Sequence, residues 1–172
     1  MNKFSLKTSL VLTLLLPIAY YFYPTQKIPE SAVIDRIIVL KSRHKLLAYS
    51  SGKLVADYKI SIGKNPLGAK EFEGDNRTPE GIYTINGKNS NSQYFKNLGV
   101  SYPNQRDTRH AKQTGKPAGG NIKIHGLKNG LGYIGKFHRW KDWTNGCIAL
   151  TNREVNELYD HTPVGTVIEI RK

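Results

Sequence analysis

Residues 122–150, IKIHGLKNGLGYIGKFHRWKDWTNGCIAL, carry the features from which both a fold and a chemistry can be predicted. Cys147, the single cysteine, follows Thr144-Asn145-Gly146 and precedes a short β-rich run. A glycine at this place lets the backbone approach a substrate closely, and amides in such a turn can point together at a developing oxyanion. A thiol becomes a nucleophile at neutral pH only where a cation or a base activates it, so a histidine is needed.

Three separated motifs occur in order along the chain. They are Thr78-Pro79-Glu80-Gly81, Ile124-His125-Gly126 and Thr144-Asn145-Gly146-Cys147-Ile148. In this order they resemble the L,D-transpeptidase catalytic-domain family, also called YkuD-like, which places the first motif before a core strand and the second on a strand. The resemblance covers residues 34–171 and implies an enzyme that acts on the stem peptides of peptidoglycan.

The sequence departs from the family pattern near the cysteine. Ala149 stands where the family commonly has an arginine near the carboxylate of the substrate, and Asn145 stands where histidine is frequent. The spacer before Cys147 is long, with KFHRWKDW inserted at residues 136–143. The run Asp-Trp-Thr-x-Gly-Cys-Ile-Ala over residues 142–149 resembles a branch whose members include a hydrolase that detaches a lipoprotein from peptidoglycan.

The resemblance implies a role for each residue of the two central motifs. Cys147 is the expected nucleophile and His125 the expected general base, with an imidazolium that stabilises the thiolate as an ion pair. The carbonyl oxygen of Gly126 is expected to hold Nδ1 of His125, and the amides of Gly146 and Cys147 to form the oxyanion hole. Attack on the carbonyl of the third stem residue expels the terminal D-Ala, and an amine or water then resolves the thioester.

Further side chains are candidates for substrate binding. These are Thr144, Asn145, Arg77, His138, Arg139 and Trp143. His138 could serve as a second base or pack within its loop, and Trp143 could line a peptide cleft or lie in the core beneath the inserted segment. The arginines could replace the missing family arginine or be ordinary surface charge. Asp142 could order the loop through backbone hydrogen bonds, and we assign it no catalytic role.

No cofactor and no metal is expected from the sequence. Residues 130–135, GLGYIG, spell a dinucleotide-binding pattern, but the residues that follow have no helical period, which such a motif requires. The histidines and Cys147 show no spacing typical of metal ligands.

The length and the charge limit the classes of function. A chain of 172 residues has room for one ordinary domain and an appendage. It carries 26 Lys and Arg against 13 Asp and Glu, a net charge of +13, which indicates an anionic partner or a basic surface that serves solubility. A single cysteine excludes an intramolecular disulfide.

Residues 8–26 form an uncharged, mostly apolar stretch that follows two lysines. At about 1.5 Å per residue, a helix of this length nearly spans a bilayer. Residues 1–26 are therefore expected to be an uncleaved signal-anchor or a cleaved signal peptide, with residues 27–33 as a linker and residues 34–172 as the catalytic domain. Basic residues before the span predict a periplasmic domain anchored to the inner membrane, or a secreted one if the signal is cleaved. Nucleic acid is not an expected partner in that compartment.

Short β-rich runs separated by turns predict a mainly β domain with one or two helices. The expected strands cover residues 36–40, 45–50, 53–62, 81–86, 94–100, 122–125 and 165–170, and Asn86-Gly87 marks a tight turn. Thr151 and Glu154 form a capping box that predicts a helix over residues 151–159. Residues 63–80 and 104–120 have no assignment, and the second segment is expected to be a flexible loop or a lid. The resemblance implies a mixed-sheet β-sandwich of the L,D-transpeptidase type, here preceded by an N-terminal membrane-spanning helix.

Three functions follow from these features. The first is a cysteine acyltransferase that forms a thioester between Cys147 and a stem tetrapeptide and passes the acyl group to an amine. The second is an endopeptidase or amidase of the same family, in which water resolves the thioester at a cross-link or at a wall-attached lipoprotein. The third, motivated by the basic charge, is a non-catalytic module that binds the cell wall.

Overall fold

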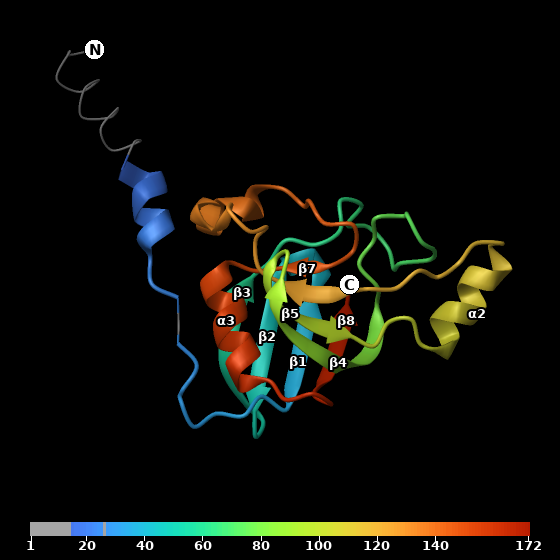
Figure 1. Ribbon diagram of the computed structural model, residues 1–172, viewed down its shortest axis with the longest axis horizontal. Helices are drawn as coiled ribbons and strands as arrows, with labels where there is room; N and C mark the ends of the chain where they lie inside the picture. Colours follow the sequence, from blue (N-terminus) through green and yellow to red (C-terminus); the bar gives the residue numbers. More distant parts are fainter. Residues whose placement is uncertain (1–14, 26) are drawn as a thin grey trace, which may run out of the picture.

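The computed structural model describes residues 15–25 and 27–172, which form a mainly β domain with a few helices (Figure 1). The strands are β1 (Arg36–Leu40), β2 (Lys45–Ser50), β3 (Lys53–Lys59), β4 (Gly81–Ser92), β5 (Phe95–Val100), β6 (Lys123–His125), β7 (Ile148–Ala149) and β8 (Val167–Arg171). The helices are η1 (Lys41–Arg43), α2 (Gln105–Gln113), η2 (Gly132–Trp140) and α3 (Asn152–His161), and residues 15–22 are also helical.

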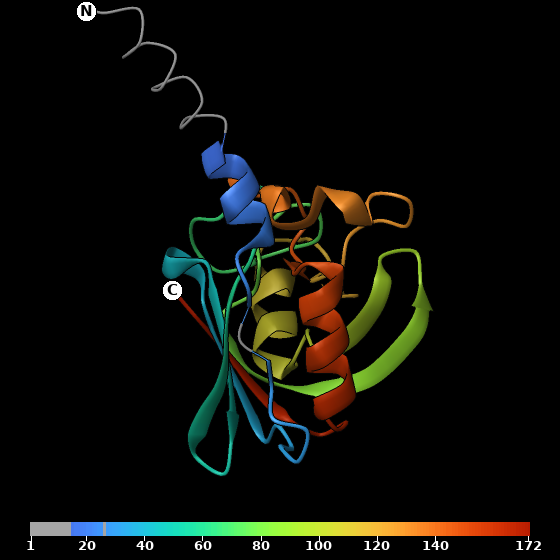
Figure 2. The ribbon, with the colours of Figure 1, turned by 90° about the vertical axis from the view of Figure 1, so that its left-hand side faces the viewer.

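The strands form one mixed sheet in the order β3-β2-β1-β8-β4-β5-β6-β7. The pairs β1–β8 and β6–β7 are parallel, and the other neighbours are antiparallel. The sheet is strongly curled (Figure 2). Ser61, just after β3, exchanges two backbone hydrogen bonds of 3.1 and 2.8 Å with Ala149 of β7, so the two ends of the sheet meet. The two layers of the predicted sandwich are therefore halves of a single sheet.

A continuous apolar core fills the inside of this curl. Its members with no exposed surface include Ile37, Val39, Leu46, Ile85, Leu98, Ile124, Ile148 and Leu150. Helix α3 packs against β5 and β6 and adds the buried side chains of Val155 and Leu158. The predicted capping box at its start is confirmed, because Thr151 N–H donates to Glu154 at 3.1 Å and Glu154 N–H donates to Thr151 Oγ1 at 3.3 Å.

The prediction of a turn at Asn86-Gly87 is wrong. Strand β4 continues through this pair to Ser92, and the connection to β5 lies after Ser92. The register with β5 shifts between Ile85 and Gly87, so the glycine marks an irregularity within the strand and not its end. Opposite it, a Cβ on Gly99 would lie 2.4 Å from Asn86 Oδ1, which explains the second glycine.

The segment expected to be a flexible loop over residues 104–120 contains helix α2. Asn104 caps this helix, because its Oδ1 accepts the amides of Arg106 at 2.9 Å and Asp107 at 3.0 Å, and Asp107 accepts from Asn104 N–H in return. The sequence signal was weak because Ala111 is the one buried residue of the helix. Without an apolar stripe, the period of 3.6 residues cannot be seen.

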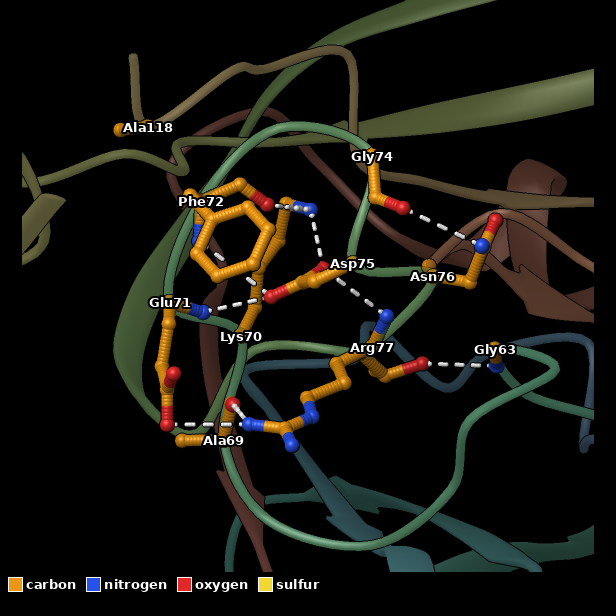
Figure 3. Close-up of polar contacts among 12 residues, drawn as sticks. Gly63, Ala69, Lys70, Glu71, Phe72, Gly74, Asp75, Asn76, Arg77 and Ala118 are labelled. Atoms are coloured by element: carbon orange, nitrogen blue, oxygen red, sulfur yellow. Dashed lines mark hydrogen bonds and ion pairs between the residues drawn. The ribbon is translucent and has the colours of Figure 1, made fainter. Parts of the chain in front are cut away.

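Residues 63–80, which had no predicted structure, are ordered by two buried lysines. Lys41 donates to the carbonyl oxygen of Thr78 at 3.0 Å and to Glu80 at 2.8 Å. Lys70 pairs with Asp75 at 2.8 Å, and both side chains are 4% exposed. Figure 3 shows Asp75 at the centre of this loop, where it also accepts the amides of Glu71, Phe72 and Arg77. Burial alone would raise the pKa of Asp75, but these hydrogen bonds outweigh it and lower the pKa.

The N-terminal predictions fall partly on residues outside the described ranges. The expected span over residues 8–26 includes residues 8–14 and 26, which the structure does not describe. Among the described residues, no helix has both the length and the apolar composition needed to cross a bilayer. In the expected linker over residues 27–33, Ile28 is buried in the core of the domain.

We expect Asp75→Ala to lower the free energy of unfolding by about 3 to 5 kcal/mol, because it leaves the Lys70 ammonium buried without its partner. Asp57→Ala is the matched control. Its ion pair with Lys45 is 35% and 39% exposed, and its loss should cost about 0 to 1 kcal/mol. Urea titrations of the three proteins measure both values.

The same carboxylate should make stability depend on pH. Because folding lowers the pKa of Asp75, its ionisation stabilises the protein above the ordinary value of 3.8, and this contribution is lost as the pH falls through the lowered pKa. The difference between wild type and Asp75→Ala should therefore shrink in acid. A difference that grows below pH 4 would contradict the assignment.

Candidate active site

His125 and Cys147 lie at neighbouring ends of two parallel strands. His125 closes β6 and pairs with Ala149 of β7, and Cys147 directly precedes β7. Because side chains alternate along a strand, Cys147 lies on the same face as Ala149 and therefore on the same face as His125. Both side chains line one cavity of about 550 Å³.

This cavity is rich in amide side chains and is basic. Its walls come from the β4–β5 hairpin, from β6 and from the segments before β6 and β7. The lining residues are Lys64, Asn89, Asn91, Ser92, Gln93, Tyr94, Asn97, Asn121, Lys123, His125, Trp143, Thr144, Asn145 and Cys147. Two lysines are the charged members of this set, so the cavity suits a peptide ligand that carries carboxylates.

The thiol of Cys147 is held close to the backbone of the segment that leads into β6. Its Sγ donates to the carbonyl oxygen of Asn121 at 3.5 Å. Burial raises the pKa of the thiol, and the backbone N–H of Lys123 together with the charges of Lys123 and Lys70 offsets part of that rise. This direction favours the neutral thiol at neutral pH.

His125 is 6% exposed and its ring is fixed by one hydrogen bond. The distance from Nδ1 to the carbonyl oxygen of Gly126 is 2.7 Å, so Nδ1 carries the hydrogen and Nε2 is left to accept a proton. The predicted contact with Gly126 is confirmed. Burial lowers the pKa of His125, the Gly126 carbonyl opposes this, and the charge of Lys123 adds to the lowering. Both shifts favour neutral groups, and the resting ion pair of thiolate and imidazolium stays a prediction.

Two aromatic rings stand beside His125. The ring of Tyr94 lies 4.8 Å from the imidazole, and that of Trp143 lies 5.6 Å from it in an edge-on arrangement. The two rings also stack on each other at 6.1 Å. Of the two alternatives predicted for Trp143, the structure supports the first, in which it lines the cavity. Tyr94, which comes from the turn between β4 and β5, was missed because an isolated tyrosine next to a hairpin carries no sequence signal of a site.

Thr144 shapes the turn that presents the cysteine. Its Oγ1 donates to the carbonyl oxygen of Cys147 at 2.7 Å and accepts the amide of Gly146 at 3.1 Å. The Gly146 amide is thus already engaged and does not offer a free donor to an oxyanion, contrary to our expectation. Gly146 has a φ of +129°, and a Cβ there would lie 2.6 Å from the carbonyl oxygen of Arg77, so glycine is required.

Asn145 faces the cavity from the same turn, with its Oδ1 accepting from Lys64 Nζ at 3.0 Å. The backbone N–H of Lys64 donates to the Thr144 carbonyl at 2.9 Å, as part of a short backbone pairing. This pairing connects the segment after β3 to the cysteine turn. Sequence reasoning missed Lys64 because it lies in the long segment without assigned structure.

His138 does not line the cavity and supports Trp143 from behind. It is 8% exposed, and Trp143 Nε1 donates to its Nδ1 at 3.3 Å. Burial, followed by the charges of Arg139 and His125, lowers the pKa of His138 to about 3. A histidine that stays neutral at every physiological pH and lies behind the wall is a packing residue, so its prediction as a substrate-binding group is wrong.

The two candidate arginines are also placed away from the cavity. Arg139 forms a buried ion pair with Glu154 of the α3 cap. The guanidinium of Arg77 pairs with Glu71 at 2.9 Å. Ala149, at the position of the missing family arginine, is fully buried. The cations of the cavity are therefore Lys64 and Lys123.

The loop order expected of Asp142 is present. Its Oδ1 accepts the amide of Ile62 at 2.9 Å, and its Oδ2 lies 2.9 Å from Nε2 of His44. Among the described residues, no three His, Cys, Asp or Glu side chains gather as a set of metal ligands.

Comparison with known proteins places this site in a family. The sequence model described as the L,D-transpeptidase catalytic domain (YkuD) matches residues 34–170. YqjB of Bacillus subtilis, described as a candidate L,D-transpeptidase, is 33% identical over 137 residues, which cover 78% of this chain and 69% of YqjB. YafK of Escherichia coli, described in the same way, is 28% identical over 109 residues, which cover 62% of this chain and 37% of YafK.

Solved structures share the fold. The helical cell shape determining protein Pgp2 of Campylobacter jejuni matches with a TM-score of 0.61 at 24% identity, covering 90% of this chain and 54% of Pgp2. Bd1075 of Bdellovibrio bacteriovorus matches with a TM-score of 0.57 at 25% identity, covering 86% of this chain and 51% of Bd1075. The chain thus spans about half the length of these two proteins and about a third of YafK.

The neutral resting state makes a kinetic prediction. Alkylation of Cys147 by iodoacetamide should accelerate with pH up to values more alkaline than for an ordinary thiol, because burial raises the pKa of Cys147. The matched control is Ser90→Cys, at an exposed position of β4, in a Cys147→Ala background. The alkylation rate of this exposed cysteine should reach its plateau at a lower pH than the rate of Cys147. A Cys147 rate that is already constant at neutral pH would show a resting ion pair instead.

Proposed function

Because the chain belongs to the L,D-transpeptidase catalytic-domain family, we propose that it is a cysteine acyltransferase that acts on the stem peptides of peptidoglycan. The observation that carries the proposal is the placement of His125 and Cys147 at neighbouring strand ends on one cavity. Nδ1 of His125 is held by the Gly126 carbonyl, so the other ring nitrogen is the one that can take a proton.

The reaction begins with a neutral thiol and a neutral imidazole. As Sγ of Cys147 attacks the carbonyl carbon of the third stem residue, Nε2 of His125 takes the thiol proton. The oxyanion that forms is stabilised by the Cys147 amide, the one donor of the predicted pair that Thr144 does not engage. His125 then returns the proton to the nitrogen of the terminal D-Ala, which leaves, and a thioester remains on Cys147.

The second half of the reaction reverses these proton transfers. An acceptor amine attacks the thioester carbonyl, His125 removes a proton from the amine, and the thiolate leaves and is reprotonated. With water in place of the amine, the same steps give hydrolysis of a cross-link or of a lipoprotein attachment. Ala149 supports this alternative, since the cavity has no arginine to hold an acceptor.

The walls of the cavity fit a peptide with free carboxylates. Five asparagines and one glutamine on the walls can each donate and accept hydrogen bonds to peptide groups. Lys64 and Lys123 supply positive charge for carboxylates of the stem peptide. The stacked rings of Trp143 and Tyr94 offer an apolar face beside His125. We further propose that the domain works outside the cytoplasm, held at the inner membrane by residues 8–26.

Product analysis tests the reaction and its alternative. The full chain, incubated with disaccharide tetrapeptides, should release D-Ala and give an acyl adduct on Cys147 in the intact-mass spectrum. Cys147→Ala and His125→Gln should each lower turnover at least about 1,000-fold. His110→Gln, in the exposed face of α2, is the matched histidine control and should retain turnover.

The products then distinguish the candidate functions. Cross-linked dimers formed with an acceptor amine indicate transpeptidation, and shortened peptides alone, even with excess amine, indicate hydrolysis. Full turnover by Cys147→Ala would end the proposal of cysteine chemistry. Binding of wall polymer without any adduct would favour the non-catalytic module.

We expect Lys64→Met to raise KM for the tetrapeptide about 10-fold or more while changing kcat little, since a charge-assisted hydrogen bond contributes about 1.5 to 3 kcal/mol. Lys64 is the cleaner probe, because the charge of Lys123 also acts on the pKa of Cys147. Lys53→Met, at the exposed start of β3, serves as the control. A substrate with amidated carboxylates should show no difference between wild type and Lys64→Met, and an equal loss on both substrates would refute carboxylate binding.

A further inference from the structure

The helix over residues 15–22 lies against η2, which overlaps the inserted residues 136–143 (Figures 1 and 2). The hydroxyl of Tyr21 donates to the carbonyl oxygen of Tyr133 at 2.8 Å. The rings of Tyr20 and Tyr21 lie 6.2 and 5.5 Å from that of Phe137. This helix is therefore packed on the catalytic domain at the insertion and nowhere near α2.

A lysine and a glycine of η2 fit the end of this helix. Lys136 Nζ donates to the carbonyl oxygens of Tyr20, at 3.3 Å, and Tyr23, which belong to the last turn and its end. A cation at this place satisfies free carbonyl groups and complements the helix dipole. Gly135 has a φ of +52°, and a Cβ there would lie 2.7 Å from the Tyr21 ring. The insertion is thus shaped to receive the helix.

The outward surface of this contact is aromatic. Four strongly exposed aromatic side chains form what we call the aromatic rim. They are Phe22 and Trp140, each 74% exposed, and Tyr23 and Tyr133, each 72% exposed. Two of them pack on rings of the contact, since Phe22 lies 5.1 Å from Tyr21 and Trp140 lies 4.8 Å from Phe137. The apolar side chains of Leu15, Leu16 and Ile18 on the helix are also more than half exposed. Exposed aromatic and apolar side chains gathered on this helix and on η2 indicate a partner.

We propose that the aromatic rim lies in the headgroup region of a phospholipid bilayer and fixes the catalytic domain to the membrane surface. Tyrosine and tryptophan prefer this region because one end of each side chain is apolar and the other forms hydrogen bonds. Phe22 and Tyr23 of the rim belong to the uncharged stretch over residues 8–26, whose helical length nearly matches the hydrocarbon core. Lys128 and Lys141, both exposed on either side of η2, suit the anionic headgroups of such a surface.

This placement brings the cavity close to the membrane. Trp140 of the rim and Trp143 of the cavity wall are three residues apart, so their Cα atoms are separated by at most about 11 Å. The domain then has a fixed orientation on the bilayer and does not move freely on a flexible linker. Its cavity faces peptide chains at a short, fixed distance from the bilayer, and the inserted segment sets that distance.

Tryptophan fluorescence tests the proposal without any measurement of catalysis. The full chain is reconstituted into nanodiscs made with phospholipids brominated on one acyl chain, which quench tryptophans at the bilayer. Trp143→Phe leaves Trp140 as the single tryptophan, and its emission should be blue-shifted and quenched several-fold relative to nanodiscs without bromine. Trp140→Phe, which removes an exposed side chain, leaves Trp143 alone and should lose most of that quenching.

Val164→Trp in a protein that also carries Trp140→Phe and Trp143→Phe is the matched control, because Val164 is exposed in the turn between α3 and β8. Its tryptophan should emit as in water and remain unquenched. A Trp140 that emits as in water would overturn the proposal, since the domain would then be detached from the bilayer. A Trp140 that is shielded but not quenched by bromine would overturn it too, because a protein partner or a second copy would then cover the rim.

Discussion

The pairing of β6 with β7 is the constraint on which the site depends. The two strands have three and two residues, too few to fix a register by themselves. Their neighbours supply the rest. Asn97 of β5 pairs with His125 on one side, and Ser61 pairs with Ala149 on the other, where the curled sheet closes. A shift of one residue in either strand would turn its catalytic side chain to the opposite face, so the closure of the sheet holds the histidine and the cysteine together.

Burial sets the chemistry that this pairing allows. It raises the pKa of Cys147 and lowers that of His125, so a charged pair is disfavoured before substrate arrives. In the proposed reaction, Nε2 of His125 takes the thiol proton as Sγ attacks, so charge develops only at that moment. The Gly126 carbonyl contributes by fixing the tautomer before this step.

The sequence could predict the motifs and the order of most strands, but not the residues that support them. The motifs around Cys147 and His125 could be identified because they are short-range signals, and α3 could be predicted because its capping box is local. Lys41 and Lys70 were not found, because a buried lysine looks like a surface one until its partners are known. The same holds for Arg139, whose carboxylate partner Glu154 lies on a helix that begins after the cysteine. Tyr94 and Lys64 reach the cavity through long-range pairing, which no spacing along the chain reveals.

The positions of the basic side chains say more about the candidate site than the net charge does. A charge of +13 in the sequence invites the idea of a surface that binds anionic polymer without specificity. Lys41, Lys70 and Arg139 pair with carboxylates inside the domain, so these pairs cancel in the net charge and the excess of +13 belongs to other basic side chains. At the candidate site, the cavity wall carries two lysines and no acidic side chain. Under the proposed function, selectivity for a carboxylate-bearing peptide rests on where these two cations lie and not on the total number of basic residues in the chain.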